Sequence, residues 1–378
     1  MAPPIDESNL EQVRACFPYV GTGVHVNHAG LAPAATKVVE AMHAAVAGLL
    51  EDDTLAPYIA HAGREKALRA ASARWMGTTP ECVGFVRNTS HGLAIAAAAL
   101  PRREGALTVC VADDYPSQIY PWQGRGPVRL VPPREDGRVH EEDLIEACAP
   151  DVDVLAVSWV HWTSGQVLDL DRLGTHCRAK GITFVVDVVQ GLGGLRLDLD
   201  RVPVDIAAAG CHKWLCTPAG IGLLYVHPET MTRLGAVNVG WNSVEDPMDW
   251  SRLHFDALRA TPRRFEEGSP SLANVAGLLA SLELFDTLGR ETIDRRVRML
   301  GDRARAELRA RGLLVHPGSA DSGIVPFRHP GMENEAVLAE LDRVRVRASE
   351  RGGWIRFSPH GYLLEEEVDA AVAAVPGA

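Results

Sequence analysis

Two charged residues of this sequence stand in surroundings where a charge is costly. Asp187 interrupts the apolar run 184–189, and Lys213 lies beside Trp214, just before a turn rich in glycine and proline. A buried carboxylate needs a partner, whereas a lysine removed from water has a lowered pKa and can attack carbonyl groups. Two plainer explanations stay open: the aspartate caps a helix or meets an arginine, and the lysine extends its amine to solvent from a strand end.

A third candidate is the segment 87–92, Arg-Asn-Thr-Ser-His-Gly, which precedes a helical pattern. The hydroxyls of Thr89 and Ser90, with the backbone N–H groups of a helix N-terminus, would form an anion site. An ordinary N-cap explains the same residues. Taken together, a lysine that forms a Schiff base, a carboxylate for a pyridinium nitrogen and a phosphate site are what a protein supplies to pyridoxal 5′-phosphate (PLP).

The elements that must position these residues follow from the apolar pattern. Short runs of nearly continuous apolar residues alternate with helical patterns, which predicts a mainly parallel, doubly wound sheet. Ligands bind beyond the carboxyl ends of such strands, and the 26 residues from Asp187 to Lys213 fit one further strand, so that both face one crevice. The strand candidates are 82–86, 107–112, 128–132, 153–159, 182–188 and 220–226, and the helical patterns include 91–100, 141–149 and 170–180.

After about residue 227 the pattern changes to that of a smaller α+β domain. We expect three regions: an N-terminal segment (1–60), helical over 20–60, that packs on the small domain or on a partner, a large domain (61–255) and a small C-terminal domain (256–378). The expected elements of the C-terminal part are helices at 271–289, 290–312, 333–349 and 364–374 and strands at 321–327 and 353–358.

Composition excludes several classes of protein. The chain has 378 residues and a formal charge of −11, whereas a nucleic-acid-binding protein would need a basic face. No apolar run approaches the roughly 20 residues that span a bilayer, and no signal sequence begins the chain. The seven scattered cysteines contain no CxxC and favour reduced, buried thiols in a cytoplasmic protein, without a disulfide framework or a metal site.

These residues resemble the class V aminotransferase and cysteine desulfurase family of PLP enzymes. The family has the fold-type I architecture, which implies a seven-stranded-type sheet domain and a smaller α+β domain. The matching motifs, in the family's order, are Asn27-His-Ala-Gly30, Asn88-Thr-Ser-His-Gly92, Asp187-Val-Val-Gln190, His212-Lys213, Arg264-Phe-Glu-Glu-Gly-Ser-Pro270 and Arg356-Phe-Ser-Pro.

The resemblance implies a role for each matched position around the cofactor. Lys213 would form the aldimine with PLP and later move the proton at Cα, and Asp187 would keep the ring nitrogen protonated. Gln190 would contact the ring hydroxyl. The phosphate would be bound by Thr89, Ser90 and His212, and by Ser269 reaching the cofactor of the partner subunit in a homodimer.

On the substrate side, Tyr115 matches an aromatic stacking position and Arg356 would pair with the α-carboxylate of an amino acid. Without the family, Tyr115 is a turn aromatic and Arg356 a half-buried strand-end residue. Asn27 and His28 belong to the first motif and are assigned to the substrate as well. His161, between Trp159 and Trp162, is either a substrate contact or part of an aromatic cluster at the domain joint.

Departures from the family decide the expected reaction. The segment 330–356, where cysteine desulfurases carry a catalytic cysteine, contains none. Pro116 replaces the desulfurase histidine, and Gly210-Cys211 replaces a serine of many relatives. We therefore expect β-elimination of the C–S lyase type through a quinonoid, with transamination or isopenicillin N epimerase-like racemisation as alternatives within the family.

Two functions outside the PLP-dependent enzymes remain open for this sequence. One is a non-catalytic protein with the PLP fold. The other is a nucleotide-dependent dehydrogenase. The sequence argues against it, because Arg196 occupies the position at which the nucleotide-binding fingerprint requires its last glycine.

Overall fold

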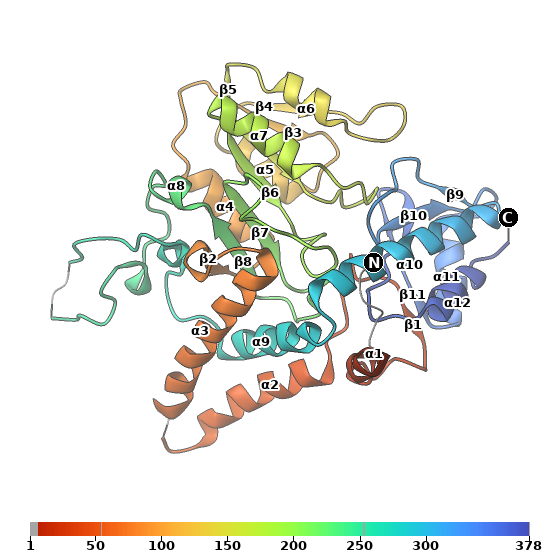
Figure 1. Ribbon diagram of the computed structural model, residues 1–378, viewed down its shortest axis with the longest axis horizontal. Helices are drawn as coiled ribbons and strands as arrows, with labels where there is room; N and C mark the ends of the chain where they lie inside the picture. Colours follow the sequence, from red (N-terminus) through yellow and green to blue (C-terminus); the bar gives the residue numbers. More distant parts are fainter. Residues whose placement is uncertain (1–6, 54, 252–253, 378) are drawn as a thin grey trace.

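A seven-stranded sheet forms the centre of the larger domain (Figure 1). The computed structural model describes residues 7–53, 55–251 and 254–377. The strand order is β2-β8-β7-β6-β5-β3-β4, and only β8 runs antiparallel to its neighbours, so the predicted mainly parallel sheet is confirmed. The strands are β2 (Val83–Val86), β3 (Leu107–Val111), β4 (Val128–Val131), β5 (Val152–Ser158), β6 (Thr183–Asp187), β7 (Ile206–Gly210) and β8 (Gly222–Val226).

Helices cover both faces of this sheet. Along β5, Val154 and Ala156 join the core under α4 and α5, whereas Leu155 and Val157 join the core under α7. This explains the nearly continuous apolar runs, because both faces of such a strand are covered. Gly92 lets α4 approach β7 closely, since a Cβ there would lie 2.8 Å from Ala208. These helices are α4 (Thr89–Ala99), α5 (Pro116–Gln123), α6 (Glu141–Ala147), α7 (Leu170–Lys180) and α8 (Pro228–Met231).

The smaller domain is built on an antiparallel sheet of order β12-β13-β10-β9. The helix expected over 333–349 ends at Arg343, because Arg345 has the left-handed φ of 61° and the chain then forms two strands. The elements are α10 (Arg290–Ala310), β9 (Leu314–Val315), β10 (Val325–Arg328), α11 (Asn334–Arg343), β11 (Val346–Arg347), β12 (Ser349–Arg351), β13 (Trp354–Phe357) and α12 (Glu365–Ala373).

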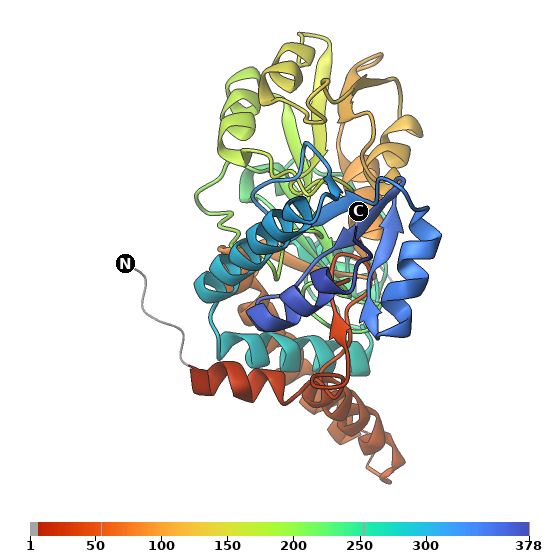
Figure 2. The same cartoon turned by 90° about the vertical axis from the view of Figure 1, so that its right-hand side faces the viewer.

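The N-terminal segment joins both domains rather than forming one helical block. Residues 20–35 consist of turns and of β1, which pairs in parallel with β11 beside the small domain (Figure 2). Arg14 of α1 pairs with Glu367 of α12 (2.6 Å), and α2 packs against α9. The division at residues 60 and 255 stays a prediction. The elements are α1 (Glu7–Arg14), β1 (Val24–His25), α2 (Thr36–Ala47), α3 (Leu55–Met76) and α9 (Leu272–Asp286).

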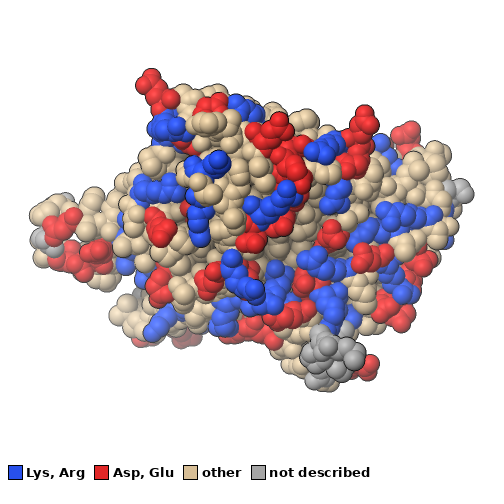
Figure 3. Space-filling view, turned by 45° about the horizontal axis from the view of Figure 1, so that its top comes forward, with Lys and Arg blue, Asp and Glu red and all other residues tan. Residues whose placement is uncertain are grey.

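The surface carries interspersed charges. On the face shown in Figure 3, acidic and basic side chains alternate over most of the area. Pairs such as Arg303 with Asp369 and Glu365 account for part of this local balance. None of the described helices is by itself long and apolar enough to cross a membrane; only α9 and α10 together meet that measure, with a bend of 80° between them. All seven cysteines are buried and free, as expected.

Candidate active site

A cavity of about 190 Å³ lies where the carboxyl ends of the parallel strands face the small domain. Its walls come from the large domain, from the N-terminal segment and from β12 and β13. Of the residues expected from sequence, it brings together Thr89, Ser90, Tyr115, Asp187, Gln190, His212, Lys213 and Arg356. It adds residues without an expected site role, among them Ser117, Ser158 and Arg351.

Asp187 faces this cavity from the end of β6, and Lys213 faces it from the turn that follows the neighbouring strand β7. Asp187 ends β6, and its register partner Ala208 lies in β7, three residues before the chain turns toward Lys213. Burial raises the pKa of Asp187 to about 7, although the N–H of Val189 (2.8 Å) and the lysine stabilise its charge. Burial likewise lowers the pKa of Lys213 to about 8, against the attraction of Asp187. The site therefore holds an amine that gives up its proton easily.

Two aromatic rings form the wall above the amine. The Nζ of Lys213 lies 5.9 Å from the centre of the Tyr115 ring, and that ring meets Trp162 edge-on at 5.5 Å. The turn that carries Tyr115 is held by the buried Asp114, which accepts bonds from the N–H (2.9 Å) and hydroxyl (2.6 Å) of Ser158. Tyr115 is thus more than a turn aromatic, since its ring covers the lysine.

The N-terminus of α4 gives the opposite end of the cavity its anion-binding character. Asn88 caps the helix by accepting from the N–H of His91 (2.9 Å), so the hydroxyls of the next two residues are not used as caps. Thr89 accepts from the N–H of Gly210 (2.8 Å), and Ser90 shares a hydrogen bond with Ser117 (2.6 Å). Each threonine or serine hydroxyl both donates and accepts, so this end can bind a phosphate.

Arg356 is buried, at 1% exposure, without a carboxylate beside it. Its NH1 donates to the backbone carbonyl of Trp162 (2.5 Å), while Nε and NH2 are buried and have no partner among the described residues. Burial, with repulsion from Arg351, lowers its pKa to about 9. A buried guanidinium with two unpaired nitrogens is strongly stabilised by a planar anion such as a carboxylate.

Gln190 lines the cavity, but its side-chain amide forms hydrogen bonds mainly with other groups of the protein. Its Nε2 donates to the carbonyl of Ala29 (3.0 Å), and its Oε1 accepts from the indole N–H of Trp214 (3.3 Å). One N–H remains for a ligand.

Four of the expected residues are not brought to the cavity. His28 is fully buried, with Nδ1 beside the carbonyl of Ser358 (3.1 Å) and Nε2 beside the Tyr362 hydroxyl (2.7 Å). Asn27 accepts from the Ser349 hydroxyl (2.7 Å). Both therefore hold the N-terminal segment against the small domain, and neither lines this cavity. Ser269 lines a separate hollow of about 280 Å³ with Arg87 and His91.

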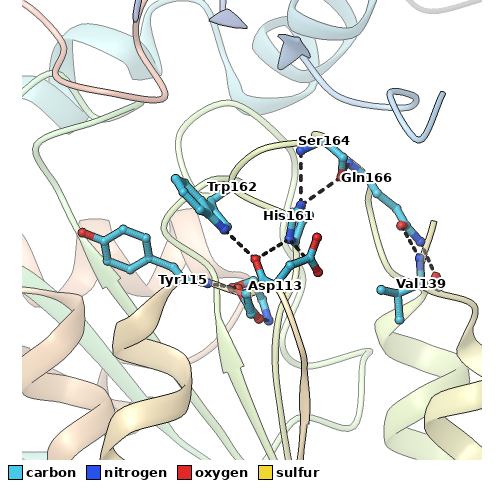
Figure 4. A network of polar contacts seen from close by, with 9 residues as sticks. Asp113, Tyr115, Val139, His161, Trp162, Ser164 and Gln166 are labelled. Atoms are coloured by element: carbon cyan, nitrogen blue, oxygen red, sulfur yellow. Dashed lines mark hydrogen bonds and ion pairs between the residues drawn. The ribbon is translucent and has the colours of Figure 1, made fainter. Parts of the chain in front are cut away.

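His161 lies behind the aromatic wall rather than in it (Figure 4). Its Nε2 is 3.1 Å from the carbonyl and 3.5 Å from the carboxylate of Asp113, and its Nδ1 is 3.0 Å from the Ser164 hydroxyl. The indole N–H of Trp162 donates to the same carbonyl (2.9 Å). His161 thus fixes the loop whose Trp162 carbonyl binds Arg356, which makes it a positioning residue.

Replacing His161 by leucine is expected to raise KM about tenfold with a smaller effect on kcat, because Trp162 and Arg356 lose part of their anchor. Burial alone would lower the pKa of His161, but Asp113 outweighs it, with a contribution from Asp114, and the pKa is raised. The imidazolium is present below that pKa and lost above it, so the wild-type KM should rise with pH. The imidazole of His316 also interacts electrostatically with that of His161.

The pH profile separates positioning from general destabilisation. The His161→Leu variant should lack the alkaline rise in KM, whereas His140→Leu, which breaks an exposed pair with Asp136, should keep it. A variant with the wild-type pH profile would remove His161 from this role.

Comparison with known proteins agrees with this geometry. The family model "Aminotransferase class-V" matches residues 29–370. The chain belongs to the class V aminotransferase family. It is 26% identical over 310 residues to a probable cysteine desulfurase of Pyrococcus abyssi (76% of each chain) and 29% identical over 329 residues to isopenicillin N epimerase of Streptomyces clavuligerus (81% of this chain, 82% of the other). A solved cystine C–S lyase with its product cysteine persulfide shares the fold, with a TM-score of 0.86, 24% identity and coverage of 94% and 98%.

Membership confirms the predicted fold type and makes this class V family member a PLP-dependent enzyme. The residues present fit the cofactor. A buried amine of lowered pKa faces the cavity, a buried carboxylate ends β6, and the hydroxyls of Thr89 and Ser90, which keep part of their hydrogen-bonding capacity, stand at the N-terminus of α4. Because the family consists of enzymes, the non-catalytic alternative is set aside.

Proposed function

We propose that this enzyme eliminates a sulfur-containing group from Cβ of an amino-acid substrate. The observation that carries the proposal is that one cavity holds a buried, easily deprotonated amine, Lys213, and a buried guanidinium, Arg356, two of whose nitrogens have no partner among the described residues. That pair can bind an amino acid by its carboxylate and remove its Cα proton. Elimination then needs no further nucleophile from the chain.

The cysteines favour elimination over a persulfide relay. All seven are buried, and Cys211 and Cys216, which flank the lysine, are fully buried in the core. A relay needs an accessible thiolate, whereas burial raises the pKa of both of these thiols. The segment 330–356, in which the resemblance to cysteine desulfurases places a catalytic cysteine, contains no cysteine.

In the proposed mechanism, PLP supplies an electron sink for the negative charge that develops at Cα. Lys213 would bind the cofactor's aldehyde and take the Cα proton, and Asp187 would stabilise a proton on the ring nitrogen. Thr89, Ser90 and His212 would hold the phosphate. Arg356 orients the substrate by its carboxylate, and the Tyr115 ring excludes water from the amine.

Screening amino acids with the purified holoenzyme tests this proposal. Cystine and cysteine S-conjugates should yield pyruvate and ammonia together with a thiol or persulfide. The principal alternative is epimerisation, favoured by the 29% identity to isopenicillin N epimerase. Inverted substrate without pyruvate, or a keto acid that keeps its side chain, would overturn elimination in favour of epimerisation or transamination.

We further propose that the enzyme is a homodimer. Ser269 does not line the cavity of its own chain, so a phosphate contact by Ser269 requires the partner's site. The projecting loop at the left of Figure 1 exposes the large apolar side chains Trp241, Met248, Trp250 and Phe255, which a second copy would cover.

Replacing Arg356 by glutamine is expected to raise KM about 100-fold while the cofactor's absorbance is kept, because the carboxylate loses a charge-assisted, bidentate partner in a buried site. The measurement is a titration of the holoenzyme with substrate. Arg328→Gln is the matched control, since Arg328 stacks on Trp354 in the same sheet outside the cavity. An unchanged KM in Arg356→Gln would exclude the assignment.

A further inference from the structure

A second arginine of the small domain, Arg351, lines the same cavity as Arg356. The reason lies in the turn between β12 and β13. Gly352 and Gly353 both have positive φ (57° and 78°), as a two-residue type I′ hairpin turn requires. The turn sets the register in which Arg351 opposes Trp354 and Ser349 opposes Arg356. Residues 351 and 356 are therefore diagonal neighbours on one face of the hairpin, about 7–8 Å apart at Cα.

Arg351 has no anionic partner within the described residues. Its NH1 donates to the carbonyl of Glu350 (2.6 Å), which leaves its charge unmatched. Burial is the main cause of the lowered pKa values of Arg356 and Lys213, and repulsion from Arg351 lowers both further, so the charge of Arg351 acts on the cavity. Among the described residues that line the cavity, Asp187 alone carries a carboxylate, and its charge interacts with that of Lys213.

In the proposed function, every anionic group of the cofactor and of a simple amino acid already has a partner, whereas Arg351 has no anionic partner among the described residues. In the proposed function, Asp187 faces the ring nitrogen, the phosphate lies at the N-terminus of α4, and the substrate's α-carboxylate pairs with Arg356. Arg351 is exposed at the rim, one diagonal step from Arg356, where the side chain of a substrate bound by its carboxylate would pass.

We propose that Arg351 is a specificity-determining residue that binds a second anionic group, such as a carboxylate, at the end of the substrate's side chain. The preferred substrate is then an amino acid with two acidic groups. This inference rests on the proposed function for the place of the α-carboxylate, but it does not depend on which bond the enzyme breaks.

Non-reactive acids test the inference by binding alone. Valerate and glutarate have the same five-carbon chain and differ in the second carboxylate, and neither has an amine that could react. With the wild-type holoenzyme, calorimetry should give a glutarate Kd lower than that of valerate on the order of fivefold. Arg351→Gln should bring the ratio close to one by weakening glutarate, and Arg351→Lys should keep part of the preference.

Arg347→Gln is the matched control, because Arg347 lies in the preceding strand, pairs with Asp342 and does not line the cavity. It changes the charge equally and should keep the wild-type ratio. Retained cofactor absorbance and circular dichroism show that each variant is folded.

Three results would overturn the inference. A ratio of the valerate Kd to the glutarate Kd near one in the wild-type enzyme would show that there is no second anion site. Equal weakening of both acids by Arg351→Gln assigns Arg351 to the same carboxylate as Arg356. Loss of the ratio in Arg347→Gln assigns the effect to general charge. Because nothing turns over, failure here leaves the proposed elimination standing, and failure of elimination leaves the glutarate preference measurable.

Discussion

Turnover in Lys213→Ala is expected to fall by at least about 10³-fold, since the variant lacks the base that removes the Cα proton. The structure gives this residue no substitute. Lys213 is the amine that lines the cavity, and among the described residues there the neighbouring imidazole of His212 has its own pKa lowered by burial and by the lysine. The two aromatic rings above the amine also restrict the approach of water, which could otherwise act as the base.

Covalent labelling checks this prediction independently of turnover. After borohydride reduction of the holoenzyme, mass spectrometry should find the cofactor fixed to the peptide that contains Lys213. The label should be lost in Lys213→Ala and kept in Lys180→Ala, which removes an exposed lysine at the end of α7. A label elsewhere in the wild-type chain would contradict the assignment.

The large sheet and the residues at its strand ends were predictable from sequence because they obey local rules. Strands buried on both faces are continuous apolar runs, and a charged residue within or just after such a run is conspicuous, as with Asp187 and Lys213. The structure places both in one cavity because β6 and β7 are adjacent, parallel strands whose carboxyl ends lie at the same edge of the sheet.

Other residues depended on tertiary contacts that no local pattern reveals. His28 and His161 have sequence surroundings similar to those of site residues, yet both rings are turned to internal partners. For Arg351 the reason is the opposite: the sequence pattern predicts a helix through residue 349, whereas Arg345 ends it and Gly352-Gly353 forms the hairpin that exposes Arg351 to the cavity. The paired glycines were the signal that could have revealed it.

The domain joint and the substrate site are linked through one carbonyl. Trp162 belongs to the large domain, and its carbonyl accepts from Arg356 of the small domain, while its indole is tied to Asp113. A substrate carboxylate that binds Arg356 therefore also contacts the joint. This explains why a residue outside the cavity, His161, is expected to alter KM.

Asp187→Asn is expected to lower kcat by about 10²–10³-fold with little change in KM. An asparagine of the same shape keeps the packing and can hydrogen-bond the cofactor's ring nitrogen, but it carries no charge that holds a proton there. A neutral ring accepts negative charge poorly, so the loss is confined to the transition state. Burial raises the pKa of Asp187 to about 7, and a cation that faces the carboxylate favours its ionised form.

A cofactor analogue methylated at the ring nitrogen separates the electronic role from a structural one. The analogue carries a permanent positive charge and needs no carboxylate to retain a proton. It should restore a large part of kcat in Asp187→Asn, and it should restore none in Lys213→Ala, where the base is missing. Near-normal turnover of Asp187→Asn with PLP itself would show that the carboxylate has no electronic function. A deficit that the methylated analogue leaves untouched would instead assign Asp187 to the positioning of the ring, because only an electronic defect is repaired by a fixed charge.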